Sequence, residues 1–216
     1  MATELGRIER PEAEGFRAGR KLYLVPLVFA PRNPPPDYAS LLEEYWRGVD
    51  EHLERLETRI GAIKHVYHES VSAAGEEALK AVEAISAYSS NICRNRVAMG
   101  ATMEAIEDAE LFGEMLDWQR CLMVGLVSQK VSTTVWQSYR DAQKRRNERI
   151  LSVIDSTLGE GEAGVLFIAE DHSLQFPVSL QVFYVAPPAL DRIHRWVRDR
   201  ARAEGEAESR DTPGQQ

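Results

Sequence analysis

The sequence predicts an α/β fold, with a small, mostly parallel sheet and a large helical insertion in a single domain. Residues 21–30 form a continuous apolar run, KLYLVPLVFA, which is typical of a strand buried on both faces. Two more apolar strands, 165–169 and 181–185, are expected near the other end of the chain. Between these regions, residues 75–158 have mostly helical periodicity. The early and late strands are therefore expected to pair in parallel across the insertion.

The composition is that of a soluble globular protein. The 216 residues suffice for one sizeable core, and hydrophobic and charged residues make up 44% and 28% of them. A formal net charge of −8 argues against a dedicated nucleic-acid binder, whose surface should be basic. Cys93 and Cys121 are too few for a disulfide framework and are expected to pack within helices. Because we find no secretory signal and no apolar run long enough to cross a membrane, we expect a cytoplasmic protein with no membrane partner.

Prolines and helical spacing set the elements of the N-terminal third. Residues 1–20 are polar and are expected to form a flexible segment. Pro26 removes a backbone donor from the first strand, which suggests an edge position or a strand that starts later. The run PRNPPP at 31–36 predicts an extended loop. Asp37 is then the expected N-cap of a long helix that ends near Ile60.

The middle of the chain forms one short strand and then becomes almost wholly helical. Residues 62–68 alternate like a half-buried strand. Gly75 opens a helix that is expected to fade at the polar residues 88–91. From about Arg94 to Leu158 helical propensity dominates. Breaks in this region are expected near three glycines: Gly100, Gly113 and Gly125.

The C-terminal part predicts the two late strands, a helix and a tail. A turn around Phe176-Pro177 links the strands, and Pro187-Pro188 begins a last helix. From about residue 203 the composition is that of disorder. The domain is therefore placed at 21–202, and residues 203–216 are expected to be a disordered tail.

The leading candidate for a functional site follows the apolar strand at 165–169, which ends on Glu170-Asp171-His172. In α/β proteins the carboxyl ends of parallel strands present polar residues to a ligand. Histidine serves there as acid, base or metal ligand, and the two adjacent carboxylates would raise its pKa. The alternative is a histidine in a surface turn whose acidic neighbours are simply solvated.

Two further histidines lie at the end of the strand predicted at 62–68. His65 and His68 are three residues apart, so in a strand they point to opposite faces and cannot both reach one ligand. His68 and the adjacent Glu69 would share the edge of His172 if the two strands end together. The alternative is that they are unrelated surface residues.

Two charged clusters complete the candidates. Glu104, Glu107 and Asp108 have a spacing that puts three carboxylates on one helical face, where a solvated surface is the default interpretation. Lys144, Arg145, Arg146 and Arg149 form a basic cluster in the helix before the key strand. That cluster would either hold an anionic group or simply complement the negative end of the helix dipole.

The common signatures of nucleotide-binding loops, zinc proteases and serine hydrolases are missing. Three other features are present: the buried strand KLYLVPLVFAP, the pair Arg146-Asn147 in a late helix, and VLFIAEDH, a strand that runs into His172. In these features the chain resembles the TraB/ChaN/erythromycin-esterase-like group of α/β proteins. That group has a first strand ending in Gly-Thr-x-His, a later Arg-Asn helix and a strand ending in Gly-x-x-His. The resemblance covers about 21–69 and 140–185 and implies that His172 is the terminal histidine of the group.

The first motif of the group is degenerate in this chain. Phe29 stands where its histidine is expected, and no acidic residue follows before Asp37. A metal or acid–base site built on two histidines would therefore have lost one of them. His68 or Glu69 would have to compensate, which depends on the geometry of the sheet edge.

Three functions are compatible with these residues, and whether the chain is an enzyme stays open. The first is a degenerate, non-catalytic member of the group that binds a small ligand or a partner protein. The second is a metal-assisted hydrolase, its metal and cofactor unknown. The third is a helical scaffold that forms homo-oligomers. The candidate catalytic residues are Glu170, Asp171, His172 and Arg146. The candidate ligand-binding residues are Phe29, His68, Glu69 and Asn147. If they are exposed, four tryptophans are candidate interface anchors, although burial in the core is the plainer interpretation: Trp46, Trp118, Trp136 and Trp196.

Overall fold

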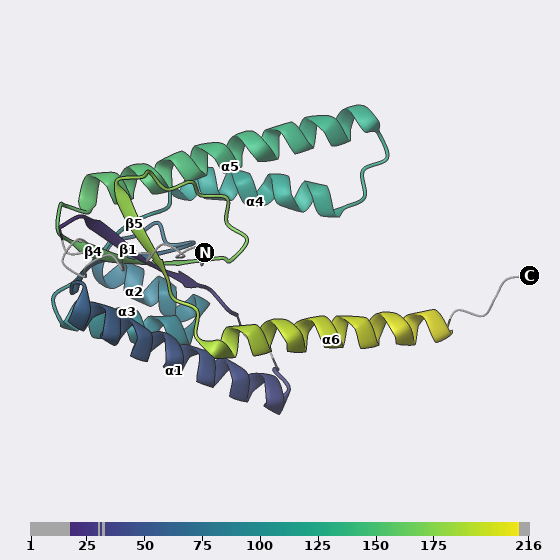
Figure 1. Ribbon diagram of the computed structural model, residues 1–216. Coiled ribbons are helices and arrows are strands. Elements are labelled where there is room, and N and C mark those ends of the chain that lie inside the picture. The colour runs from purple at the N-terminus through teal and green to yellow at the C-terminus, as the bar shows by residue number, and fades with distance from the viewer. Residues whose placement is uncertain (1–17, 30, 32, 212–216) are drawn as a thin grey trace, which may run out of the picture.

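The computed structural model describes residues 18–29, 31 and 33–211, with side chains through 204. These residues form a five-stranded, all-parallel sheet in the order β3-β2-β4-β1-β5, with helices on both faces (Figure 1). The predicted α/β class is confirmed. The strands are β1 (Arg20–Pro26), β2 (Ile63–His68), β3 (Thr102–Met103), β4 (Ala163–Ile168) and β5 (Leu180–Tyr184). The helices are α1 (Pro36–Arg59), α2 (Gly75–Ile85), α3 (Ala87–Ala98), α4 (Ala109–Met123), α5 (Gln129–Thr157) and α6 (Pro188–Asp211).

The strands β1 and β4 pair in parallel across the helical insertion, as the apolar runs predict. Their register places Leu24 opposite Leu166, and both strands are buried on both faces. The expectation that Pro26 marks an edge strand is wrong, because β1 lies between β4 and β5. Pro26 is instead the last residue of β1, where a missing N–H does not interrupt the ladder. The apolar residues after Pro26 therefore leave the sheet.

Each face of the sheet has its own core. On one face, Tyr23, Val25 and Phe167 pack against α1, the α2–α3 pair and the start of α6. On the other face, Leu24 and Leu166 pack against the C-terminal half of α5 and the loop that follows β4. Helices on both faces explain why the strands are continuous apolar runs instead of alternating ones.

Two expected helix boundaries in the first half of the chain are corrected. Asp37 is not the N-cap of α1, because the helix begins at Pro36 and Asp37 lies in its first turn. Its carboxylate accepts a hydrogen bond of 2.6 Å from the Trp196 indole and so ties α1 to α6. Residues 88–91 do not end a helix but lie within α3, whose N-cap is Ser86. The side chain of Ser86 accepts from the Ser89 N–H, which is the usual reason for serine at this position.

The predicted helical insertion contains a strand that the sequence did not reveal. Strand β3 has two residues, too few for a periodicity signal, and it pairs with β2 through Val66 and Met103. Gly100 and Gly125 break the helices as expected, and both have positive φ. Gly113 lies inside α4, so no break occurs there.

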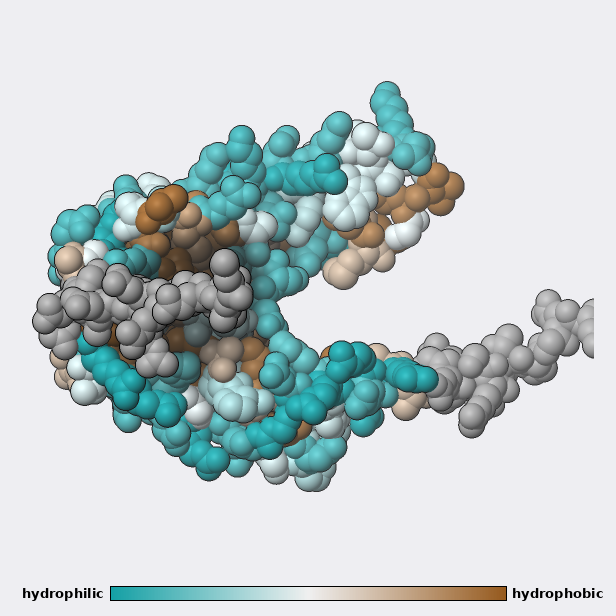
Figure 2. Space-filling model, in the orientation of Figure 1, coloured by the Kyte–Doolittle hydropathy of each residue, from teal (hydrophilic) through white to brown (hydrophobic). Residues whose placement is uncertain are grey.

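Two projections extend beyond the carboxyl edge of the sheet, the edge at which all five strands end. Helices α4 and α5 form an antiparallel hairpin on one side, and α6 leaves on the other (Figure 1). A broad hollow opens between them (Figure 2). Helix α6 continues through Asp211 and so contradicts the disorder expected from about residue 203. The segments predicted to be flexible at 1–17 and disordered at 212–216 lie outside the described residues.

Candidate functional site

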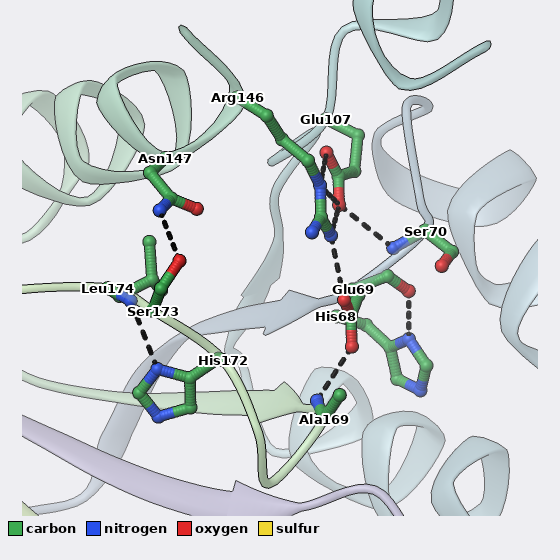
Figure 3. A network of polar contacts seen from close by, with 10 residues as sticks. All are labelled: His68, Glu69, Ser70, Glu107, Arg146, Asn147, Ala169, His172, Ser173 and Leu174. Carbon is green, nitrogen blue, oxygen red and sulfur yellow. Dashed lines mark hydrogen bonds and ion pairs between the residues drawn. The ribbon is translucent and has the colours of Figure 1, made fainter. Parts of the chain in front are cut away.

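A buried ion cluster joins α5 to the carboxyl edge of the sheet. Nε of Arg146 donates to both carboxylate oxygens of Glu107 at 3.0 Å. Its Nη2 donates to Glu69 at 2.8 Å and makes a further short contact with Glu107 (Figure 3). The Glu107 side chain is 1% exposed, and the side chains of Arg146 and Glu69 are 9% and 15% exposed. One guanidinium thus compensates two buried carboxylates, as buried charges require.

Backbone amides complete this cluster. Glu69 accepts 2.6 Å from the N–H of Ala169, which follows β4. Glu107 accepts 3.2 Å from the N–H of Ser70, a residue with the unusual φ of 68°. The cluster thereby fastens the ends of β2 and β4 and the loop after β3 to α5. Burial alone would lower the pKa of Arg146, but the hydrogen bonds and charges of Glu107 and Glu69 outweigh it and raise that pKa.

His172 lies beside the cluster but does not join it. The side chain is half-buried, and its Nδ1 accepts a 3.2 Å hydrogen bond from the Leu174 N–H. The neutral ring therefore carries its proton on Nε2. Burial lowers the pKa of His172, although the charges of Glu69 and Asp171 act in the opposite direction. The expectation that adjacent carboxylates raise this pKa is wrong, because desolvation of the ring outweighs them.

Arg146 and Asn147, the predicted Arg-Asn pair, both hold α5 against the sheet edge. Arg146 reaches Glu69 and Glu107, whereas the Asn147 amide donates 2.8 Å to the Ser173 hydroxyl in the loop after β4 (Figure 3). The other members of the basic cluster face outward, and Arg145 pairs with Glu114 on the surface of the hairpin. Only one arginine of the predicted cluster therefore enters the site.

Glu170 belongs to a second, exposed cluster on the same edge. Its carboxylate accepts 3.1 Å from the Tyr184 hydroxyl at the end of β5 and lies 2.7 Å from Nε2 of His194 on α6. The side chains of Glu170 and His194 are 44% and 45% exposed. Partial burial, together with the Glu170 bond and charge, raises the pKa of Tyr184 to about 12. Glu170 and His172 thus face different neighbours, although they are two residues apart.

His68 is a core residue and not part of an open site. It is fully buried, with Nδ1 2.7 Å from the Glu69 carbonyl and Nε2 3.0 Å from the Ser89 hydroxyl. Burial lowers the pKa of His68. His65 lies on the opposite face, 2.8 Å from Glu104, which confirms the expected divergence of the two histidines. The proposal that His68 compensates for a lost histidine at the site of His172 is therefore not supported by its position.

Phe29 is half-exposed beyond the end of β1, where its carbonyl accepts from the Tyr38 hydroxyl. Among the described residues, no hydrogen bond, ion pair or ring contact joins Phe29 to the Arg146 cluster. Asp171, the remaining predicted catalytic residue, is exposed to solvent. Within the described part of the chain, Arg146 and Glu69 are the only two of the eight predicted site residues whose side chains bond to each other, and His68 contacts Glu69 only through its backbone carbonyl.

The prediction that Glu104, Glu107 and Asp108 share a solvated helical face is wrong. All three precede α4 in a loop, and Glu104 contacts His65 while Asp108 caps α4 by accepting from the Leu111 N–H. Glu107 is the site residue that sequence reasoning missed. One signal was available: Arg146 lies four residues before Ile150 on the buried stripe of α5, and a buried arginine requires an acidic partner.

Cavities near this edge are open rather than enclosed. A hollow of about 360 Å³ runs along α5 beside Ser173, and Asn147 and Leu151 are among the residues that line it. Arg146, Glu69 and His172 do not line this hollow. Among the described residues, no group of three or more histidine, cysteine, aspartate or glutamate side chains is placed to hold a metal ion.

Comparisons of the chain with protein-family models, curated proteins and solved structures found no match. The resemblance to the TraB/ChaN/erythromycin-esterase-like group thus stays a prediction based on the motifs quoted above. No helix among the described residues is long and apolar enough to cross a membrane.

Proposed function

We propose that this chain is a non-catalytic binding protein whose partner docks at the carboxyl edge of the sheet. The observation that carries the proposal is that Nε and Nη2 of Arg146 already donate to Glu107 and Glu69. An arginine that holds an anionic substrate needs free donors, and a carboxylate that acts as a base needs a free oxygen near the substrate. In this cluster the charged groups satisfy one another instead.

His172 lacks the setting of a general base. A catalytic histidine is normally oriented by an acceptor on one nitrogen, which leaves the other nitrogen free to take a proton. Here the backbone N–H of Leu174 occupies Nδ1, so Nε2 carries the proton of the neutral ring. His172 is thus prepared to donate a hydrogen bond to a bound partner.

The shape of the edge favours a polypeptide as the partner over a small molecule. Sites for small molecules enclose most of the ligand surface. The hollow between the α4–α5 hairpin and α6 is broad and open (Figure 2). The exposed Glu170, Tyr184 and His194 offer polar groups at the same edge.

Turnover assays test the non-catalytic part of this proposal. Wild type and His172→Ala are assayed on chromogenic carboxylic esters and phosphate monoesters and on a protease substrate, with chelator and with added zinc or manganese. We expect no turnover that depends on His172. Turnover that is present in wild type and lost in His172→Ala would overturn the proposal.

Affinity capture from source-cell extract tests the binding part. Glu170→Lys reverses the charge of an exposed edge residue, and Glu54→Lys makes the same change near the C-terminal end of α1, toward the opposite edge of the sheet. We expect a partner that is retained by wild type and Glu54→Lys and lost from Glu170→Lys. A set of captured proteins that is identical for all three chains contradicts docking at this edge.

A metal-assisted hydrolase is the second candidate, and one observation favours it. Glu69 contacts Arg146 directly, and its charge also acts on His172, so three predicted catalytic or ligand-binding residues lie in one neighbourhood. Elemental analysis of untagged protein distinguishes the two candidates. Near-stoichiometric metal that disappears in both His172→Ala and Glu69→Gln would favour the hydrolase.

A further inference from the structure

The end of the α4–α5 hairpin exposes a group of apolar side chains. We call residues 122–131 the hairpin tip. Met123 and Val124 are 73% and 72% exposed, and Val127 is fully exposed. The apolar surface lies at the far end of the upper projection, away from the sheet (Figure 2). Single exposed apolar residues are common, but a contiguous group at the end of a projection marks an interaction surface.

The sequence around the hairpin tip carries only positive charges. Residues 118–140 include Arg120, Lys130 and Arg140 and contain no aspartate or glutamate, in a chain with 34 acidic residues and a net charge of −8. Arg120 pairs with Asp117 on the exposed surface of α4. Lys130, within the tip, has no ion pair in the described part of the chain. The hairpin end therefore differs in sign from the molecule as a whole.

Aromatic side chains lie behind the tip. Trp136 is half-exposed on α5 and meets Tyr139 edge to face, with ring centroids 6.1 Å apart. Trp136 is seven residues into α5, or about 10 Å from the start of the helix at a rise of 1.5 Å per residue. Tryptophan and tyrosine favour the interface between lipid headgroups and acyl chains. The distance of Trp136 from the start of α5 is comparable to the depth of about 5–10 Å to which surface-bound segments enter a bilayer.

We propose that the hairpin tip docks on an anionic lipid surface. Met123, Val124 and Val127 enter the acyl boundary, and Lys130 faces the negatively charged headgroups. Apolar insertion and attraction to anionic lipid are the two contributions that hold peripheral proteins on membranes. The expectation of no membrane partner rested on the absence of a spanning run, and surface docking requires no such run.

A second copy of the chain fits the tip less well. The tip is convex and basic, so a protein partner would need an acidic recess. A cavity of about 600 Å³ between α1 and the start of α6 is lined by Arg47, Arg55 and Arg59 as well as by two glutamates. Like charges across an interface are costly. A deformable anionic surface needs no matching recess.

Vesicle co-sedimentation tests the proposal with vesicles of phosphatidylcholine alone or mixed with phosphatidylserine. We expect wild type to bind the mixed vesicles, to bind neutral ones less and to be released by salt. Val127→Glu should lower the partition coefficient about tenfold or more, since it places a charge at the inserted tip. Lys130→Glu should lower it about fivefold for each unit of charge.

Matched controls separate the tip from the general surface. Val178→Glu alters another fully exposed valine, and Lys80→Glu alters an exposed lysine on α2. Both should bind vesicles as wild type does, and all four variants should keep the wild-type circular dichroism and melting temperature. Absence of vesicle binding by wild type, or equal binding by Val127→Glu, overturns the proposal. If wild type instead sediments as a dimer that Val127→Glu dissociates, the second copy is the occupant and the lipid proposal is wrong.

Discussion

Two carboxylate clusters lie at the carboxyl edge of the same sheet, and they are built in opposite ways. Glu69 and Glu107 are buried, share the guanidinium of Arg146 and accept hydrogen bonds from backbone amides. Glu170 is exposed and contacts the Tyr184 hydroxyl and the His194 ring. The first cluster connects four segments of the chain, and the second connects the end of β4 to β5 and α6.

The difference indicates which of the two clusters can meet a partner. Charges that are removed from water are held by their partners, because breaking the contact leaves an uncompensated buried charge. Exposed ion pairs contribute little, so exchanging one for contacts with another molecule costs little. We infer that the Arg146 cluster maintains the shape of the edge, whereas the Glu170 cluster is the part available for recognition.

The largest expected effect comes from Arg146→Met. This variant keeps much of the side-chain volume but leaves two buried carboxylates without their cation, and we expect a loss of about 3–5 kcal/mol in the free energy of unfolding. Arg145→Met, the neighbouring residue with an exposed partner in Glu114, should lose about 0–1 kcal/mol. Urea unfolding followed by circular dichroism measures both. Equal losses in the two variants would show that burial does not distinguish the two arginines.

Glu107→Gln tests how the buried cluster balances its two carboxylates against one guanidinium. The change removes one of two negative charges that share a single guanidinium, so Glu69 remains to compensate Arg146. We expect a loss of about 1–3 kcal/mol, the contribution of hydrogen bonds to a charged group and less than for Arg146→Met. Glu114→Gln, on the exposed hairpin, is the matched control. A loss for Glu107→Gln greater than that for Arg146→Met would mean that Glu69 cannot hold the arginine by itself.

Protonation of the buried His68 should also make the free energy of unfolding depend on pH. Its folded pKa is lowered by burial, so the unfolded chain binds the proton more readily. The stabilisation is therefore present above the ordinary pKa of histidine and is lost as the pH falls below it, at no more than about 1.4 kcal/mol per pH unit for one proton. Urea midpoints should decrease from about pH 7.5 to about pH 5.5. The decrease should be smaller in His68→Asn, and an unchanged pH dependence in this variant would contradict the assignment.

The sheet could be predicted from the sequence because strands that are buried on both faces consist of continuous apolar runs. The runs at 21–30 and 165–169 correspond to β1 and β4, and their parallel pairing follows from the helices between them. Strand β3 could not be recognised in this way, since its two residues are too few to form an apolar run or to show a period. Helix boundaries were also missed where a single side chain decided them, as Ser86 does by capping α3.

The candidate site was only half predictable, because its residues are distant in sequence. Arg146 and Glu69 were selected individually and do meet, 77 residues apart. Glu107 was assigned to solvent because its acidic neighbours suggested a solvated helix, whereas the chain forms a loop there that turns this one carboxylate inward. His68 was placed at an open edge because no sequence pattern reveals that Ser89 lies 3.0 Å from its ring.

The smallest expected effect belongs to Glu170→Gln in the exposed cluster. The variant keeps the size of the side chain and its capacity to accept from Tyr184, but it removes the charge that faces His194. Because both members of that ion pair are well solvated, we expect a loss of about 0–1 kcal/mol in the free energy of unfolding. Thermal unfolding at neutral pH measures it, with His194→Gln as the reciprocal variant. If either change destabilises the protein as much as Glu107→Gln does, the exposed cluster is a structural contact, and the separation between a shape-maintaining cluster and a recognition cluster at this edge fails.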